Sequence, residues 1–122
     1  MSIDEKPKFL LNVSMDVAPE REALFNTVYE EHIRELLNVP GVVGVRRYRR
    51  RPLKMSFEGI IQEFDVEGEP TYSALYELER PEALTSDAWA NYVEKGRWAP
   101  EIRPFVRNRR RTMHELISEQ CK

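Results

Sequence analysis

The fold is decided by residues 29 to 48, which read YEEHIRELLNVPGVVGVRRY. Apolar residues recur at three- and four-residue spacing through its first half and back to Leu24, which is typical of an amphipathic helix. Pro40 cannot continue a helix and Gly41 tolerates the turn that follows, so we expect the helix to end there. Val42 begins a run of β-branched residues that gives way to arginines, which indicates a strand.

The same order of elements occurs twice along the chain. Residues 9–17 alternate apolar and polar side chains, which predicts a strand before the first helix. Residues 71–79 predict a third strand, Ser86 has the character of an N-cap for a second helix that stops at Gly96, and residues 107–117 predict a fourth strand. This order predicts an α+β, ferredoxin-like βαββαβ fold, with a four-stranded antiparallel sheet and two helices on one face.

The connection between the second and third strands, residues 51–69, fits no single pattern. Pro52, Gly59 and Gly68 punctuate it, yet its apolar residues are too many for a solvated loop. We therefore expect a short extra strand or a packed flap.

Composition indicates one domain over residues 1–122. The 33% of charged residues and 41% of hydrophobic residues are those of a soluble globular protein. No apolar run reaches the ~18 residues of a membrane helix, the first residues lack the apolar core of a signal peptide, and the one cysteine can close no internal disulfide. We expect a cytoplasmic protein, with flexible ends at residues 1–8 and 118–122 and no membrane partner.

Arginines form two clusters, at residues 46–51 and 107–111, on the predicted edge strands. Charged edges discourage aggregation, and we expect these arginines to pair with acidic residues. The alternative is that Arg47 or Arg109 points inward and holds an anionic ligand. Because the net charge is −2 and the third strand lacks the RNP pattern of RNA-binding sheets, no nucleic-acid partner is expected.

Two helices cover only one face of the predicted sheet, so its other face stays open. Leu10, Leu75 or Tyr76, and Leu116 make that face partly apolar. An exposed apolar sheet face marks an interaction site, and a second copy across a two-fold axis covers it most economically. We expect a homodimer through the open sheet face.

These patterns resemble the dimeric α+β barrel superfamily, and most closely its EthD-like members. The resemblance rests on the helix pattern F-x3-Y-x2-H-x3-L over residues 25–36, on residues 39–48, and on residues 72–84. It implies two ferredoxin-like subunits whose open sheet faces meet and enclose a cleft, in a superfamily that includes monooxygenases, isomerases, decarboxylases and dehalogenases. Haem-binding members carry a histidine at the second helix. Residues 86–104 have none, so we expect no cofactor.

His32 is the best candidate for chemistry, because the resemblance makes it the first-helix histidine that is directed toward the pocket. Histidine suits general acid–base catalysis near neutral pH. The alternative is a structural histidine that is hydrogen-bonded to Glu31, Glu35 or a strand carbonyl.

Five further residues are candidates for ligand binding, with core or interface roles as the alternative: Asn12, Tyr29, Arg47, Trp98 and His114. Asn12 is similar to the first-strand asparagine of cofactor-free quinone-forming monooxygenases. Trp98 would wall a pocket, and His114 would face the same cleft from the last strand. Two histidines so far apart, without an acidic residue at ligand spacing, predict no metal site.

Together these features predict a protein that binds a small, partly apolar organic molecule, anionic or carbonyl-bearing, in the cleft between sheet and helices. If it is an enzyme, His32 would be the acid–base group of a cofactor-independent reaction, with Asn12 and Tyr29 orienting the substrate. The alternative is a non-catalytic dimeric binding or interaction module whose cleft is packed shut.

Overall fold

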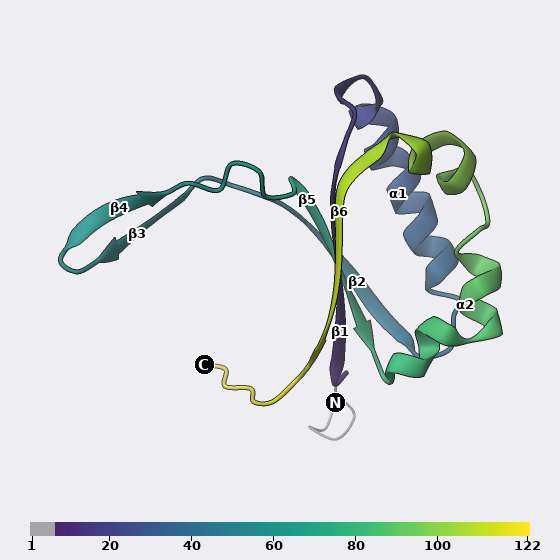
Figure 1. Cartoon of the computed structure of the whole chain (residues 1–122). Coiled ribbons are helices and arrows are strands. Elements are labelled where there is room, and N and C mark those ends of the chain that lie inside the picture. Colours follow the sequence, from purple (N-terminus) through teal and green to yellow (C-terminus); the bar gives the residue numbers. More distant parts are fainter. Residues whose placement is uncertain (1–6) are drawn as a thin grey trace.

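The computed structural model describes residues 7 to 122 and has a four-stranded antiparallel sheet at its centre, in the order β2–β5–β1–β6. The strands are β1 (Phe9–Val17), β2 (Val42–Arg49), β5 (Tyr72–Leu78) and β6 (Val106–Glu115). Helices α1 (Glu22–Leu36) and α2 (Asp87–Tyr92) lie on the same side of this sheet (Figure 1). The predicted α+β, ferredoxin-like fold is confirmed, and β2 and β6 are its edges.

The core lies between the sheet and α1, because both elements present one apolar side. In β1 and β5, alternate residues point toward the helices, as the period of a strand requires. In α1 the buried residues follow helical spacing. The buried residues of these three elements are Leu11, Met15, Val17, Phe25, Val28, Tyr29, His32, Leu36, Tyr72, Ala74, Tyr76 and Leu78.

Short helical turns fill the remaining connections. Three are 3₁₀ turns, at Pro19–Arg21, Pro81–Thr85 and Arg103–Phe105, and one is a π-helical turn at Trp98–Ile102. Ser86 caps α2 as predicted, since its Oγ accepts a hydrogen bond from the Trp89 backbone N–H at 3.1 Å. The second helix is shorter than expected, because it ends at Tyr92 and not at Gly96.

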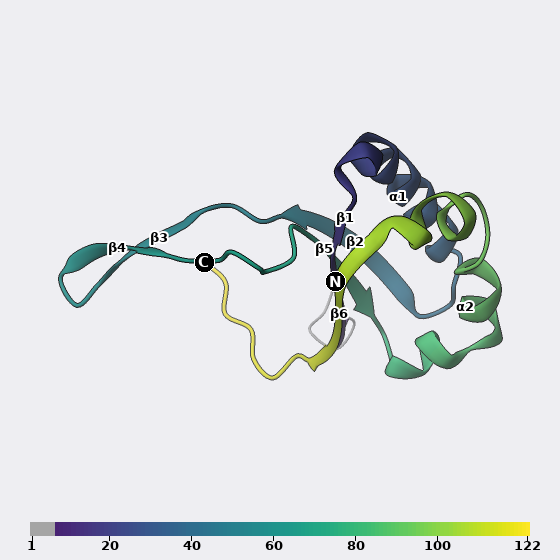
Figure 2. The same ribbon diagram turned by 45° about the horizontal axis from the view of Figure 1, so that its top comes forward.

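The connection over residues 51–69 differs most from the expectation. It contains two strands, β3 (Leu53–Phe57) and β4 (Ile60–Phe64), which form a hairpin. Glu58 and Gly59 both have positive φ, at 54° and 81°, as a two-residue hairpin turn requires. The hairpin projects away from the sheet, on the side opposite the helices (Figures 1 and 2). Of the two expected alternatives, extra strands are present and a packed flap is not, since within residues 7 to 122 the two strands pair only with each other.

Two sequence expectations concern the ends of the chain and membranes. The predicted flexible segment at residues 1–8 lies mostly outside the described residues. Within residues 7 to 122, no helix is long and apolar enough to cross a membrane.

Gly41 makes the sharp exit from α1 possible. Its φ is +97°, and its carbonyl oxygen accepts a hydrogen bond from the Glu79 N–H at 2.8 Å. A Cβ atom at this position would lie 3.0 Å from the Cβ of Ala83. Both the backbone conformation and the close approach of Ala83 therefore require glycine.

We expect Gly41→Ala to lower the free energy of unfolding by about 2–3 kcal/mol, because it adds a steric contact to backbone strain. Gly68→Ala is the matched control, since its φ is +89° but no atom lies within 4 Å of the added Cβ. In urea denaturation, the control should lower the free energy of unfolding by only about 1 kcal/mol. Equal losses in the two variants would contradict the role given to the Ala83 contact.

Candidate functional site

His32 lies in a cluster of three stacked or edge-packed rings, which we call the aromatic cluster: Tyr29, His32 and Trp98. The imidazole is only 6% exposed and stacks on the indole of Trp98, with ring centroids 4.9 Å apart and planes inclined by 17°. Tyr29 meets the two rings edge-on, with its ring centroid 5.9 Å from that of His32 and 5.0 Å from that of Trp98. The cluster joins α1 to the π-helical turn at Trp98–Ile102.

The imidazole of His32 is held in its neutral form. Burial and the nearby positive charge of Arg103 lower its pKa to about 4, and Glu94 opposes this only in part. Within the described residues, Nδ1 is fully buried and has no hydrogen-bond partner. No hydrogen bond joins His32 to Glu31, whose two carboxylate oxygens accept from Arg97 instead. A neutral ring of this kind can exchange a hydrogen bond with a molecule that enters beside it.

A pair of tyrosine hydroxyls borders the same space. The hydroxyl oxygens of Tyr29 and Tyr76 are 2.8 Å apart and buried. Burial raises the pKa of both groups above the usual value. Both hydroxyls therefore stay protonated, and since only one proton lies between the two oxygens, the other remains available for donation.

Three arginines contribute positive charge to this region: Arg103, Arg109 and Arg111. Arg103 forms an ion pair with Glu94, with Nη1 and Oε2 2.9 Å apart. Among the described residues, Arg109 and Arg111 form neither an ion pair nor a side-chain hydrogen bond. Partial burial, together with Arg111 and Arg103, lowers the pKa of Arg109. Arg109 is thus a half-buried guanidinium that is repelled by Arg111 and Arg103 and lacks a counter-ion within residues 7 to 122.

These groups line one cleft of about 100 Å³ between the sheet and the helices, which we call the sheet–helix cleft. Its walls mix rings and aliphatic side chains with the polar groups just described. The residues that line it are Val13, Met15, Tyr29, His32, Leu36, Tyr76, Trp89, Val93, Trp98, Arg103, Arg109 and Arg111.

The sequence-predicted candidates divide between this cleft and other places. His32, Tyr29 and Trp98 come together in it. Arg47 also points toward the helix side, but it packs over the Tyr29 ring at 4.8 Å and donates to Asn26 Oδ1 at 2.7 Å. The guanidinium of Arg47 therefore interacts with groups outside the sheet–helix cleft or with the ring of Tyr29 at its border.

Asn12 and His114 lie on the other face of the sheet. Neighbours Leu11 and Val13 point toward the helices, so Asn12 points away, where its Oδ1 accepts from Ser14 Oγ at 3.1 Å. His114 pairs with Leu10 across the strands, and its Nε2 lies 3.0 Å from Thr112 Oγ1. Strand alternation therefore separates Asn12 and His114 from His32 and from the sheet–helix cleft. A role of either residue in ligand binding stays a prediction.

Sequence reasoning did not identify Arg103, Arg111 or Tyr76 as site residues. The two-residue spacing of Arg109 and Arg111 places both on one face of β6, so the sequence indicates that Arg111 points to the same side as Arg109. Arg103 lies in an irregular turn, where no periodicity indicates direction. Arg109 is one of the two arginines for which the sequence allows an inward orientation, and it does line the cleft.

The neutral state of His32 predicts a pH dependence of stability. An unfolded chain binds a proton on this ring near pH 6.5, whereas the folded chain binds it only near pH 4. Between these values the unfolded state holds more protons, so the free energy of unfolding falls as pH is lowered, by about 3 kcal/mol in total. The loss of stability begins as the pH falls to the pKa of His32 in the unfolded chain, and it is complete below the pKa of His32 in the folded chain.

We expect the free energy of unfolding from urea denaturation to fall in this way between pH 6.5 and pH 4 in the wild type, and His32→Phe to lack this contribution. A ¹H NMR titration of the His32 ring should have its midpoint near pH 4. A midpoint near 6.5 would show that the ring is not desolvated as described.

Comparison with known proteins identifies the fold. No protein-family model and no curated protein matches the sequence. A variant of MhuD with two manganese protoporphyrin IX bound per active site is 17% identical, with a TM-score of 0.61, over 93% of this chain and 99% of that one. The haem-degrader MhuD from Mycobacterium tuberculosis, with two haems bound in its active site, is 14% identical, with a TM-score of 0.59 and the same coverage.

A variant of SnoaB, a cofactor-independent oxygenase from Streptomyces nogalater, is 12% identical, with a TM-score of 0.62, over 95% of this chain and 99% of that one. At these identities the likeness concerns the fold alone. The chain shares the ferredoxin-like α+β fold of these proteins along nearly its whole length.

Proposed function

We propose that this protein binds a small, partly apolar organic anion in the sheet–helix cleft. The observation that carries the proposal is Arg109, a half-buried guanidinium without an ionic partner in the described chain, which lies in one cleft with the unpartnered imidazole of His32. A buried charge is costly unless it is paired. A carboxylate or phenolate would supply the pair, and arginine binds carboxylates with two parallel hydrogen bonds.

The size and walls of the cleft narrow the class of ligand. Its volume of about 100 Å³ lies below the ~300 Å³ at which pockets for drug-sized molecules begin. The indole of Trp98 and the ring of Tyr29 offer flat apolar surfaces. A single ring or a short branched chain that carries one acidic group fits both the small volume and the apolar walls of the cleft.

Haem, which is bound by MhuD, does not fit these residues. The cleft is much smaller than a tetrapyrrole needs. The ring of His32 is covered on one side by Trp98, and α2 contains no histidine. No haem chemistry is therefore assigned to this chain.

For catalysis, we propose His32 as the acid–base group of a cofactor-independent reaction, a class that includes SnoaB. A neutral imidazole can take a proton from an acidic C–H or O–H group of a bound molecule. With a pKa of about 4 it is a weak base by itself. An anion beside it would raise that pKa by stabilising the imidazolium, and the Tyr29–Tyr76 pair would donate to the developing oxyanion.

The competing function is a non-catalytic dimeric module with a closed cleft. The low exposure of His32 and the small volume of the cleft favour it. The two functions differ in whether an anion enters at all. In both, we propose that the chain forms a homodimer through the open face of its sheet.

Benzoate and its neutral analogue benzamide test the proposal by isothermal titration calorimetry at pH 7. We expect benzoate to bind at least about tenfold more tightly, which corresponds to ~1.4 kcal/mol. Arg109→Gln should abolish this difference. Arg107→Gln, on the same strand but exposed and outside the cleft, is the matched control and should preserve it.

Benzoate should also raise the midpoint of the His32 NMR titration in the wild type. If benzoate and benzamide bind equally, or neither binds, the closed module is the better account. If benzoate binds without a change in that midpoint, the acid–base role of His32 loses its support.

A further inference from the structure

The hairpin of β3 and β4, which we call the arm (residues 53–64), has one apolar face without a partner. Residues that oppose each other across an antiparallel pair share a face. Leu53 and Phe64, Met55 and Gln62, and Phe57 and Ile60 form one face, while Lys54, Ser56, Ile61 and Glu63 form the other. The five apolar side chains of the first face are 36% to 62% exposed.

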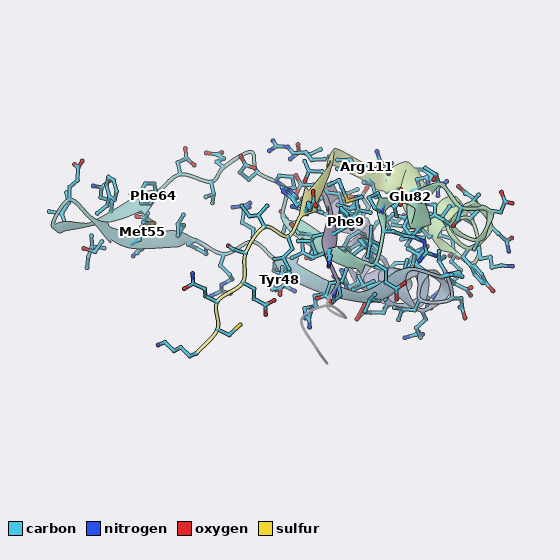
Figure 3. All side chains as sticks on the ribbon, turned by 90° about the horizontal axis from the view of Figure 1, so that it is seen from below. Phe9, Tyr48, Met55, Phe64, Glu82 and Arg111 are labelled. Atoms are coloured by element: carbon cyan, nitrogen blue, oxygen red, sulfur yellow. The ribbon has the colours of Figure 1, made fainter. Side chains whose placement is uncertain are left out.

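Nothing in the described chain covers the arm. Figure 3 shows Met55 and Phe64 well apart from the side chains of the body. A two-stranded hairpin by itself is marginally stable in water, and an apolar face of this size marks an interaction site. The arm therefore requires a surface that residues 7 to 122 of its own chain do not provide.

A groove that is lined in part by apolar residues lies on the same side of the sheet as the arm. Its volume is about 690 Å³, and Leu10, His114, Leu116 and Ile117 are among the residues that line it. Leu116 and Ile117 are 46% and 94% exposed, so the groove offers uncovered apolar surface beside the charged residues Arg46, Glu77 and Glu115 of its lining. In Figure 1 the C-terminal segment and the arm both extend from the sheet on the side away from the helices.

The arm and the groove lie at opposite ends of the strands. The arm begins beyond Arg49, which pairs with Tyr72 at one end of the sheet. The groove surrounds the start of β1, where Phe9 pairs with Leu78 and Glu115 at the other end. A single chain cannot bring the two together.

We infer that the arm of one copy lies in the groove of a second copy, and that the exchange is reciprocal. A two-fold axis perpendicular to the strands, between two facing sheets, puts each end of one sheet over the opposite end of its partner. Both arms and both grooves are then covered at once. The placement of the arm and the groove at opposite ends of one sheet is the argument for a second copy, because this axis brings each arm to the end of the partner sheet that carries the groove.

The open face itself is compatible with such an approach. Asn12, Ser14 and Thr112 lie on it, together with Leu75 of β5, which is opposite Asn12. Its charged residues have partners: Arg46 pairs with Glu77, and Arg110, which lies opposite Ser14, pairs with Glu69. This inference rests on the proposed homodimer and is independent of any ligand in the sheet–helix cleft.

Sedimentation velocity at micromolar concentration tests the inference with two matched charge insertions. Phe57→Glu places a carboxylate on the apolar face of the arm, and Ser56→Glu places the same group one residue away on the polar face. We expect a dimer for the wild type and for Ser56→Glu, and at least a hundredfold weaker dimer for Phe57→Glu. Circular dichroism should show the same folded body in all three.

Disulfide trapping checks the contact directly, in a Cys121→Ser background. Ile60→Cys protein mixed with Leu116→Cys protein should form a reducible heterodimer, while Lys54→Cys in place of Ile60→Cys should not. A monomeric wild type would overturn both the homodimer and the arm exchange. A dimer that survives Phe57→Glu, or that forms no trapped heterodimer, would overturn arm exchange alone, and benzoate binding would stand or fall separately.

Discussion

The stacking of Trp98 on His32 is the contact on which the rest of the candidate site depends. It holds an irregular stretch of chain against α1, where no periodic apolar pattern could do so. It also covers the imidazole, which removes the ring from water and favours its neutral form. The buried Nδ1 atom without a partner in the described chain costs on the order of 1–3 kcal/mol, unless a molecule in the cleft satisfies it.

The last strand supplies the complementary half of the site. The pairing of β1 with β6 shifts register between Ser14 and Asp16, near Asn108, whose φ is +52°. Beyond this irregularity Arg109 and Arg111 line the cleft, so an edge strand brings to the covered side of the sheet two cations that have no ionic partner in the described part of the chain. Neutral histidine, protonated tyrosines and unpaired arginines together favour a molecule that carries its own negative charge.

Strong periodicity made the fold predictable from sequence, whereas the site was only partly predictable. The helical spacing of apolar residues predicted α1, and Pro40–Gly41 predicted where it ends. The alternation of apolar and polar residues in β1 predicted a strand of the sheet. The same alternation places Asn12 on the open face, away from His32. Arg103 could not be found, because irregular backbone carries no directional pattern. For the arm the sequence left an extra strand and a packed flap as alternatives, because hydrophobicity shows that Phe57 and Ile60 require cover but not whether their own chain provides it.

The most direct test of the site is a crystal structure determined in the presence of benzoate. We expect a planar anion in the sheet–helix cleft, with its carboxylate against the guanidinium of Arg109 and its ring beside Trp98. The opposite result is a cleft that remains closed, with a protein group hydrogen-bonded to Nδ1 of His32 and a protein carboxylate paired with Arg109. That result would mean that the polar groups serve the fold, and the proposed anion site would be withdrawn.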